Sequence, residues 1–183
     1  QSRGGKGVKG VTTKSEDEIA LLAVTNTHRT LYLFTTRGRV FGVKGFTLPE
    51  PKTGKGKLIN TIITLEKDER VVAIKDSQLE DAKFVFFITK NGTAKRLPVE
   101  ELDGLTRAGR RVLGLADDDI ISRVRVTNGN DEILLTTAQG QTLRVEEEEF
   151  RPLGRQAQGV RGIRLDEGDT VVGCDIVTKG KQV

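Results

Sequence analysis

The segment Phe84-Val85-Phe86-Phe87-Ile88-Thr89-Lys90-Asn91-Gly92-Thr93-Ala94 reads as an apolar strand, a tight turn and the start of a second strand. Asn-Gly between two such runs is the strongest short-range signal for a β-hairpin. Two other segments align with this one, at 31–40 and 133–142, and their turn glycines are Gly38 and Gly140. The three turn glycines lie 54 and 48 residues apart, so the chain repeats one hairpin.

Each hairpin is followed by a loop of glycines and cations, and then by two more strands that an acidic turn separates. We expect these strand pairs at 58–64 and 71–76, at 112–116 and 120–126, and at 160–165 and 170–177. Four strands in a unit of about 50 residues are typical of a propeller blade. The sequence therefore predicts an all-β, β-propeller-like fold of four-stranded blades.

The repeat divides the chain into units within a single repeat domain, 1–183. We expect the second half of one blade at 1–29, complete units at 30–82, 83–130 and 131–178, and the start of a next element at 179–183. About three and a half blades do not close a ring comfortably, so either two or three blades are missing or the structure is an open arc. The absence of Met and a start inside a loop indicate a piece of something longer.

The lack of long apolar runs and the single cysteine indicate where in the cell the protein resides. No apolar run approaches the roughly 18 residues of a membrane span, and there is no signal peptide, so we expect a cytoplasmic protein. The single cysteine, Cys174, cannot form an internal disulfide and suits a reducing compartment. Because it lies in an apolar run, we expect it to be a small buried hydrophobe.

Positive charge recurs at one phase of the repeat, although the net charge of the chain is only +4. Residues 37–57 carry six basic side chains and one acid, 90–111 six and three, and 144–164 five and four. In an array of blades such a pattern would place a basic stripe along one surface. Ordinary solvated strand ends are the alternative interpretation.

The most cationic loop is Gln1-Ser2-Arg3-Gly4-Gly5-Lys6-Gly7-Val8-Lys9-Gly10, which has no acid. Glycines let a backbone approach a ligand closely, and Arg and Lys supply the charge that phosphate oxygens require. Weaker versions of this loop follow at 54–57, 107–111 and 154–162. The pattern predicts repeated contacts with a polyanion.

Catalytic and metal sites find no support in the sequence. Gly5 to Gly10 spells G-x-G-x-x-G, but it neither follows a visible strand nor opens a helix, so a dinucleotide site is not indicated. His28 is the only histidine, and the sequence shows no convincing triad of a nucleophile, a general base and a residue that orients the base. The acids at 117–119 could hold a hard cation, and those at 146–149 could form a boundary that repels a polyanion, but we expect both groups to be solvated. We therefore expect no catalytic residue, no metal and no cofactor in this domain.

Residues Gln1 to Gly7 resemble the glutamine, basic, arginine, glycine, glycine, basic, glycine box of the C-terminal domain of the A subunit of bacterial DNA gyrase. The resemblance continues through Thr36-Arg37-Gly38-Arg39-Val40, Lys90-Asn91-Gly92, 155–161 and 165–169, and so runs nearly the whole length. One departure is Ser2, where the box is usually basic. The resemblance implies about half of a six-bladed β-pinwheel whose blades exchange strands with their neighbours.

The same resemblance implies a function. Such a domain binds, bends and wraps duplex DNA without sequence preference around its basic rim, and so supports negative supercoiling by a type IIA topoisomerase. The family's catalytic tyrosine, ATP and Mg²⁺ belong to other parts of the enzyme, whose implied subunits are an A homodimer and two B subunits. The residues that we expect to contact DNA are Gln1, Arg3, Gly4, Gly5, Lys6, Gly7, Lys9, Arg37, Arg39, Lys44, Lys55, Lys57, Lys95, Arg96, Arg110 and Arg111.

Two alternative functions stay open. The C-terminal domain of topoisomerase IV, which steers substrates, is similar but has a degraded box or none, whereas here the box is nearly complete. A propeller that serves as a protein-interaction scaffold is the other alternative. A scaffold should show no steep dependence of DNA binding on salt.

Overall fold

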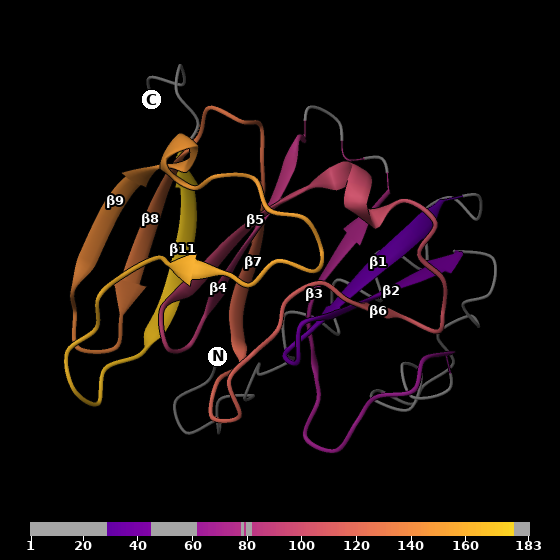
Figure 1. Cartoon of the computed structure of the whole chain (residues 1–183), viewed down its shortest axis with the longest axis horizontal. Coiled ribbons are helices and arrows are strands. Elements are labelled where there is room, and N and C mark those ends of the chain that lie inside the picture. The colour runs from indigo at the N-terminus through magenta and orange to yellow at the C-terminus, as the bar shows by residue number, and fades with distance from the viewer. Residues whose placement is uncertain (1–28, 45–61, 78, 80–81, 178–183) are drawn as a thin grey trace, which may run out of the picture.

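The computed structural model describes residues 29–44, 62–77, 79 and 82–177, whose strands form three antiparallel sheets in succession (Figure 1). Sheet 1 has the order β3 (Val71–Asp76), β1 (Thr30–Thr35), β2 (Arg39–Lys44) and β6 (Arg110–Arg111). Sheet 2 has the order β10 (Val160–Arg161), β5 (Thr93–Pro98), β4 (Phe84–Thr89) and β7 (Ile121–Thr127). Sheet 3 has the order β11 (Val171–Val177), β8 (Glu132–Thr137) and β9 (Thr142–Glu146). The predicted all-β pinwheel fold is confirmed.

The three predicted hairpins are β1–β2, β4–β5 and β8–β9. Their turn glycines have φ of +77° at Gly38, +91° at Gly92 and +89° at Gly140, a region that side chains with a Cβ rarely adopt. In each turn the glycine N–H donates to the carbonyl of the threonine three residues earlier. Glycine at this position therefore fixes the register of each hairpin, as the sequence predicted.

Sheets 1 and 2 each take their outer strand from the following unit. β6 belongs to the unit that begins with β4, yet it pairs with β2; β10 belongs to the unit that begins with β8, yet it pairs with β5. The strands expected at 112–116 and 160–165 are therefore corrected to two-residue strands, at 110–111 and 160–161. The segment expected as a strand at 58–64 lies mostly outside the described residues.

The core lies between the sheets. Val85 and Phe87 on one face of β4 pack against sheet 1, and Phe86 and Ile88 on the other face pack against sheet 3. Both faces are covered, so β4 is a continuous apolar strand. β8 instead alternates buried and half-buried positions because only one of its faces is covered by another described sheet.

Two acidic turns hold the hairpins in place. Asp119 Oδ1 accepts hydrogen bonds from the backbone N–H of Asn91 (3.0 Å) and Ile120 (2.9 Å). Asp169 Oδ1 accepts from Gln139 (3.0 Å) and Thr170 (2.8 Å) in the same way. Desolvation by itself would raise the pKa of Asp169, but hydrogen bonds from the Thr137 side chain and from backbone N–H groups, including those of Gln139 and Thr170, outweigh it and lower the pKa. The expectation of a fully solvated turn at 117–119 was wrong for Asp119, which is buried, because its carboxylate satisfies the turn's backbone donors.

Cys174 is buried, as predicted, and desolvation raises the pKa of its thiol to about 12. The described residues also contain the 3₁₀ helices η2 (Val99–Leu102) and η3 (Glu147–Glu149). Over the described residues, no helix has the length and apolar character to cross a membrane.

Candidate nucleic-acid interface

The outer strands β6 and β10 carry exposed arginines at equivalent positions. Arg111 lies opposite Arg39 of β2, and Arg161 lies opposite Thr93 of β5, in the same register of their sheets. The next residue along each outer strand donates its N–H to a hairpin glycine carbonyl, 2.8 Å in both cases: Val112 to Gly38, and Gly162 to Gly92. The repeat thus places Arg111 and Arg161 at the outer edges of successive sheets.

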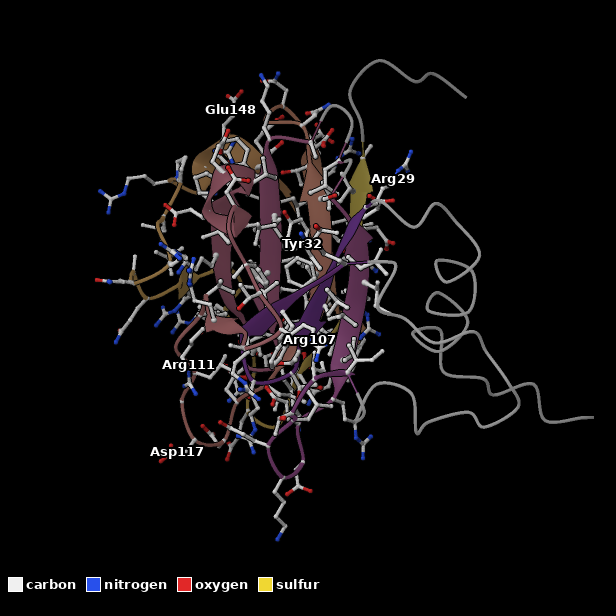
Figure 2. The ribbon with its side chains drawn as sticks, turned by 90° about the vertical axis from the view of Figure 1, so that its right-hand side faces the viewer. Arg29, Tyr32, Arg107, Arg111, Asp117 and Glu148 are labelled. Carbon is white, nitrogen blue, oxygen red and sulfur yellow. The ribbon has the colours of Figure 1, made fainter. Side chains whose placement is uncertain are left out.

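Further exposed cations surround these two positions. Figure 2 shows Arg111 on the opposite side of the molecule from Arg29. The exposed cations on or beside the outer strands are Arg107, Arg110, Arg111, Arg161 and Arg164. We call these five the rim arginines. Arg107, Arg161 and Arg164 were not among the predicted contacts, although the glycine and cation loops at 107–111 and 154–162 were the signal that could have identified them.

Glycines seat β10 against β5. A Cβ on residue 159 would lie 2.6 Å from Thr93 Cγ2 and 2.7 Å from the Ala94 carbonyl oxygen, and one on residue 162 would lie 2.7 Å from Ala94 Cβ. Real Cβ atoms essentially never approach so closely, so a side chain at either position would push β10 away. The glycines of this loop therefore serve strand packing, which in turn fixes the position of Arg161.

The structure does not bring all of the predicted contacts to this surface. Arg110 and Arg111 are exposed on β6, Lys44 is exposed at the end of β2, and Arg37 is half-buried in the first hairpin turn. The predicted contacts that lie outside the described residues are Gln1, Arg3, Gly4, Gly5, Lys6, Gly7, Lys9, Lys55 and Lys57.

Lys95 is fully buried. Its ammonium donates to the carbonyl oxygens of Val112 (2.6 Å), Ala157 (2.6 Å) and Arg155 (3.2 Å). Burial lowers the pKa of this ammonium, while the charge of Glu101 opposes the shift. The expectation that Lys95 contacts DNA does not fit its position, because all three N–H donors are used inside the protein.

Arg96 is also buried and holds sheet 2 to sheet 3. Its guanidinium donates to Glu147 Oε2 (3.1 Å), to the Phe150 carbonyl (3.1 Å) and to the Gly129 carbonyl (3.2 Å), and it lies 3.7 Å from the centre of the Phe84 ring. A role in DNA contact therefore does not fit Arg96 either. Glu147 was expected to be solvated, but it is buried because it also accepts from Thr127 Oγ1 and the Asp131 N–H.

Arg39 is neutralised by a carboxylate. It forms an ion pair with Glu69, which also accepts from Thr35 Oγ1 (2.6 Å) and from the Glu66 N–H (2.9 Å). Burial of Glu69 by itself would raise its pKa, but the hydrogen bonds from Arg39 and Thr35 outweigh burial and lower it to about 2. Arg39 therefore has less charge to offer a ligand than the exposed rim arginines.

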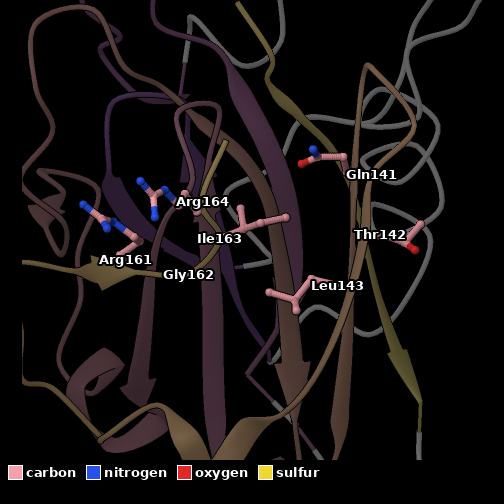
Figure 3. Close-up of a pocket in the computed structure, with 7 residues that line it drawn as sticks. All are labelled: Gln141, Thr142, Leu143, Arg161, Gly162, Ile163 and Arg164. Carbon is pink, nitrogen blue, oxygen red and sulfur yellow. The ribbon is translucent and has the colours of Figure 1, made fainter. Parts of the chain in front are cut away.

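A pocket of about 580 Å³ lies beside the second outer strand. Ile163 and Leu143 face each other across it in Figure 3, with Arg161 and Arg164 on one side and Gln141 and Thr142 on the other. Gln141 and Thr142 have in sheet 3 the positions that Thr93 and Ala94 have in sheet 2, where β10 pairs. The pocket therefore occupies the place of an outer strand on sheet 3.

The chemistry available at this surface is electrostatic. Exposed guanidiniums on a regular backbone frame can bind phosphate oxygens, and nothing in the arrangement selects a base sequence. No group of three or more potential metal ligands occurs among the described residues. The rim arginines are thus suited to contact phosphate groups on the surface of a polyanion.

Comparisons with known proteins agree with this geometry. The family model of the DNA gyrase C-terminal domain, a beta-propeller, matches residues 1–26, 29–76, 83–128 and 131–178. Over 181 residues the chain is 58% identical to the A subunit of DNA gyrase from Aminobacterium colombiense, covering 99% of the chain and 22% of that protein. Over 180 residues it is 40% identical to the A subunit of DNA gyrase from Staphylococcus epidermidis, covering 96% and 20%. The chain therefore spans about a fifth of the length of these relatives.

Two solved structures share the fold. The C-terminal domain of DNA topoisomerase IV superimposes with a TM-score of 0.76 at 28% identity, over 85% of this chain and 49% of that one. The DNA gyrase A C-terminal domain superimposes with a TM-score of 0.64 at 24% identity, over 82% and 48%. The second likeness supports the fold alone.

Proposed function

The chain belongs to the family of DNA gyrase C-terminal domains, and from that premise we propose that it binds duplex DNA along its rim and bends it. The observation that carries this proposal is the repeat of an exposed arginine, Arg111 and Arg161, at equivalent positions of two successive outer strands. Cations at regular intervals on a curved array can follow a phosphate backbone. Contacts of this kind give affinity without sequence preference.

Bending requires several blades to act together. Bending a short duplex smoothly by 40–90° costs about 1–6 kcal/mol, which a single phosphate contact does not offset. A nucleosome meets such a cost with many backbone contacts along a curved surface. The rim arginines of sheets 1 and 2, together with the cations of the Gln1–Gly7 box, would share the cost in the same way.

The biological role that we propose is support of negative supercoiling by a parent gyrase. In that role the chain performs no chemistry, and the wrapped DNA is presented with a positive crossing to a catalytic core elsewhere in the parent polypeptide. The partners would be double-stranded DNA and the other chains of an A2B2 enzyme, in which two A chains pair with two B chains. The setting would be the bacterial cytoplasm, on nucleoid DNA.

Topoisomerase IV-like steering of DNA is the second candidate, and the TM-score of 0.76 to that domain favours it. Ligation of a nicked plasmid in the presence of the chain separates the two functions. Wrapping should change the linking number of the closed circles, whereas steering should leave it unchanged although DNA is bound.

Salt dependence separates both candidates from a protein-interaction scaffold. For duplex DNA the logarithm of the binding constant should fall with the logarithm of salt concentration, with a slope of about −0.9 per phosphate contact. A slope near zero on a random-sequence duplex would contradict the proposed function.

A further inference from the structure

Lys95 lies where the outer strands of two neighbouring sheets approach each other. Its side chain is fully buried, and its ammonium donates to the carbonyl of Val112, which directly follows β6 of sheet 1. The same ammonium donates to the carbonyls of Arg155 and Ala157, in the loop that leads into β10 of sheet 2. One side chain therefore joins the segments that carry Arg111 and Arg161.

The geometry is that of a completed cage. An ammonium has three N–H donors, and the three carbonyl acceptors lie at 2.6, 2.6 and 3.2 Å. A buried charge without such partners is strongly unfavourable, so the three carbonyl acceptors stabilise the buried ammonium of Lys95. The cage therefore opposes separation of the two segments.

The equivalent position in sheet 1 shows that this lysine is not required by the fold itself. Phe41 lies three residues after Gly38, as Lys95 lies three residues after Gly92, and the two have the same register in their hairpins. Phe41 is buried, and its ring lies under Gly109, close to where a Cβ on residue 109 would be. In sheet 1 the loop before the outer strand packs on the apolar ring of Phe41. In sheet 2 the equivalent loop is hydrogen-bonded to the charged side chain of Lys95.

We infer that Lys95 is a positioning residue that fixes the spacing between the rim arginines of sheets 1 and 2, and through that spacing the curvature imposed on DNA. This inference rests on the proposed function. The Lys95 ammonium is buried and bonded to three carbonyls, so its effect passes through β6 and the loop before β10. Removing the ammonium should therefore make the distance between the rim arginines of the two sheets more variable, although all five arginines are still present.

A distance measurement tests the spacing without DNA. Ala108 and Gln158 are exposed and directly precede Gly109 and Gly159, so Ala108→Cys and Gln158→Cys accept spin labels, while Cys174 is buried. We expect a single narrow distance in this background and a broad distribution once Lys95→Met is added. Lys90→Met, on an exposed lysine of the same hairpin, is the matched control and should leave the distance narrow.

A bending measurement tests the consequence. End-labelled duplex shorter than the persistence length of about 150 base pairs should bend less with the Lys95→Met chain, by energy transfer at saturating protein. Its Kd should change by less than the tenfold that 1.4 kcal/mol represents, and the salt slope should be unchanged because the same phosphates are still neutralised. A general loss of structure would lower affinity and slope together.

Lys95→Leu, which removes the ammonium without copying the ring of Phe41, serves if Lys95→Met does not fold. A narrow label distance in either folded variant would overturn the inference, as would a broad distance with unchanged DNA bending. If the unsubstituted chain fails to bind DNA, the proposed function fails, while the label distances still decide whether Lys95 holds the two segments together.

Discussion

Arg96 and Glu147 form a buried ion pair that joins sheet 2 to sheet 3, with Arg96 Nε 3.1 Å from Glu147 Oε2. Both side chains are almost entirely removed from solvent, and each has further hydrogen-bond partners. The pair lies at the point where the chain passes from one blade to the next, because Glu147 also accepts from the N–H of Asp131 in the connecting segment. The contact between these blades therefore combines a buried ion pair with an apolar cluster that includes Phe86, Ile88 and Ile133.

Removing one partner of this pair should strongly destabilise the domain. We expect Arg96→Met to lower the free energy of unfolding by about 3–5 kcal/mol, because Glu147 is left charged and unpaired in the interior. The double variant Arg96→Met with Glu147→Leu should be destabilised less. Arg144→Met is the control, because its ion pair with Glu132 is largely exposed on the arginine side and should contribute less than about 1 kcal/mol. Urea unfolding measures all three, and equal destabilisation by Arg96→Met and Arg144→Met would contradict the assignment.

The rim arginines should determine the salt dependence of DNA binding. Arg111→Ala with Arg161→Ala should lower the affinity and reduce the slope against log salt by about 0.9 for each phosphate that is no longer neutralised. Arg123→Ala should have little effect, because this exposed arginine lies on β7, at the opposite edge of sheet 2 from β10. A filter-binding titration over several salt concentrations measures both. If Arg123→Ala matched the double variant, binding would depend on total charge and not on the rim.

The box at Gln1–Gly7 lies outside the described residues, and its role is predicted from sequence. We expect Arg3→Ala with Lys6→Ala to weaken bending more than binding, because the rim arginines still neutralise phosphates. Energy transfer between the ends of a labelled duplex, read at saturating protein, measures the bend. Unchanged transfer in the double variant would exclude the box from bending.

Glu69 should make the domain acid-sensitive over a defined range. Its pKa is about 2 in the folded protein, against an ordinary value of 4.5. A folded-state pKa that is lowered contributes stability above the ordinary value, and this contribution is lost as pH falls from 4.5 towards 2. The difference in unfolding free energy between the unsubstituted chain and Glu69→Gln should therefore be constant near neutral pH and shrink below pH 4.5. A difference that stayed constant down to pH 2 would show that Glu69 titrates normally.

The seating of β10 can be tested with a single methyl group. Gly159→Ala should destabilise the domain, because the added Cβ would lie 2.7 Å from the Ala94 carbonyl oxygen, which cannot move without breaking β5. Gly114→Ala is the control, because a Cβ there would have nothing within 4 Å. We expect a cost of about 1–3 kcal/mol for the first, typical of overpacking, and little for the second. Thermal unfolding with equal midpoints would rule out a tight seat.

The sequence predicted the parts of the fold that local chemistry specifies. Asn91-Gly92 and its equivalents determine hairpins on their own, and the continuous apolar run at 84–88 predicted a strand. The family resemblance implied that neighbouring blades exchange strands, but the local sequence did not show that β6 and β10 are the exchanged strands, because a two-residue strand has almost no pattern. The paired residues are 66 to 72 positions apart in the chain, and pairing over that distance leaves no local pattern.

The candidate site was predicted less well, for a related reason. Lys95 and Arg96 follow a hairpin turn, as Arg39 does. The sequence pattern around such a cation is the same whether its side chain is exposed to solvent or buried against backbone carbonyls. Glu147 was concealed in a run of four acids, and only tertiary contact distinguishes it from Glu148 and Glu149, which are exposed. By contrast, Arg110 and Arg111 were predicted as contacts and are exposed on an outer strand.

Sheets 1 and 2 each contain an outer strand from the following sequence unit. This arrangement limits where the gene can be divided. A deletion of 131–178, which follows the repeat boundaries, would also remove β10. The edge of β5 in the remaining sheet 2 would then be exposed. The independent building block is offset from the sequence repeat: it runs from one hairpin through to the glycine-cation loop of the next unit. Shuffled or shortened versions of this array should be cut after that loop, where each remaining blade retains its borrowed edge.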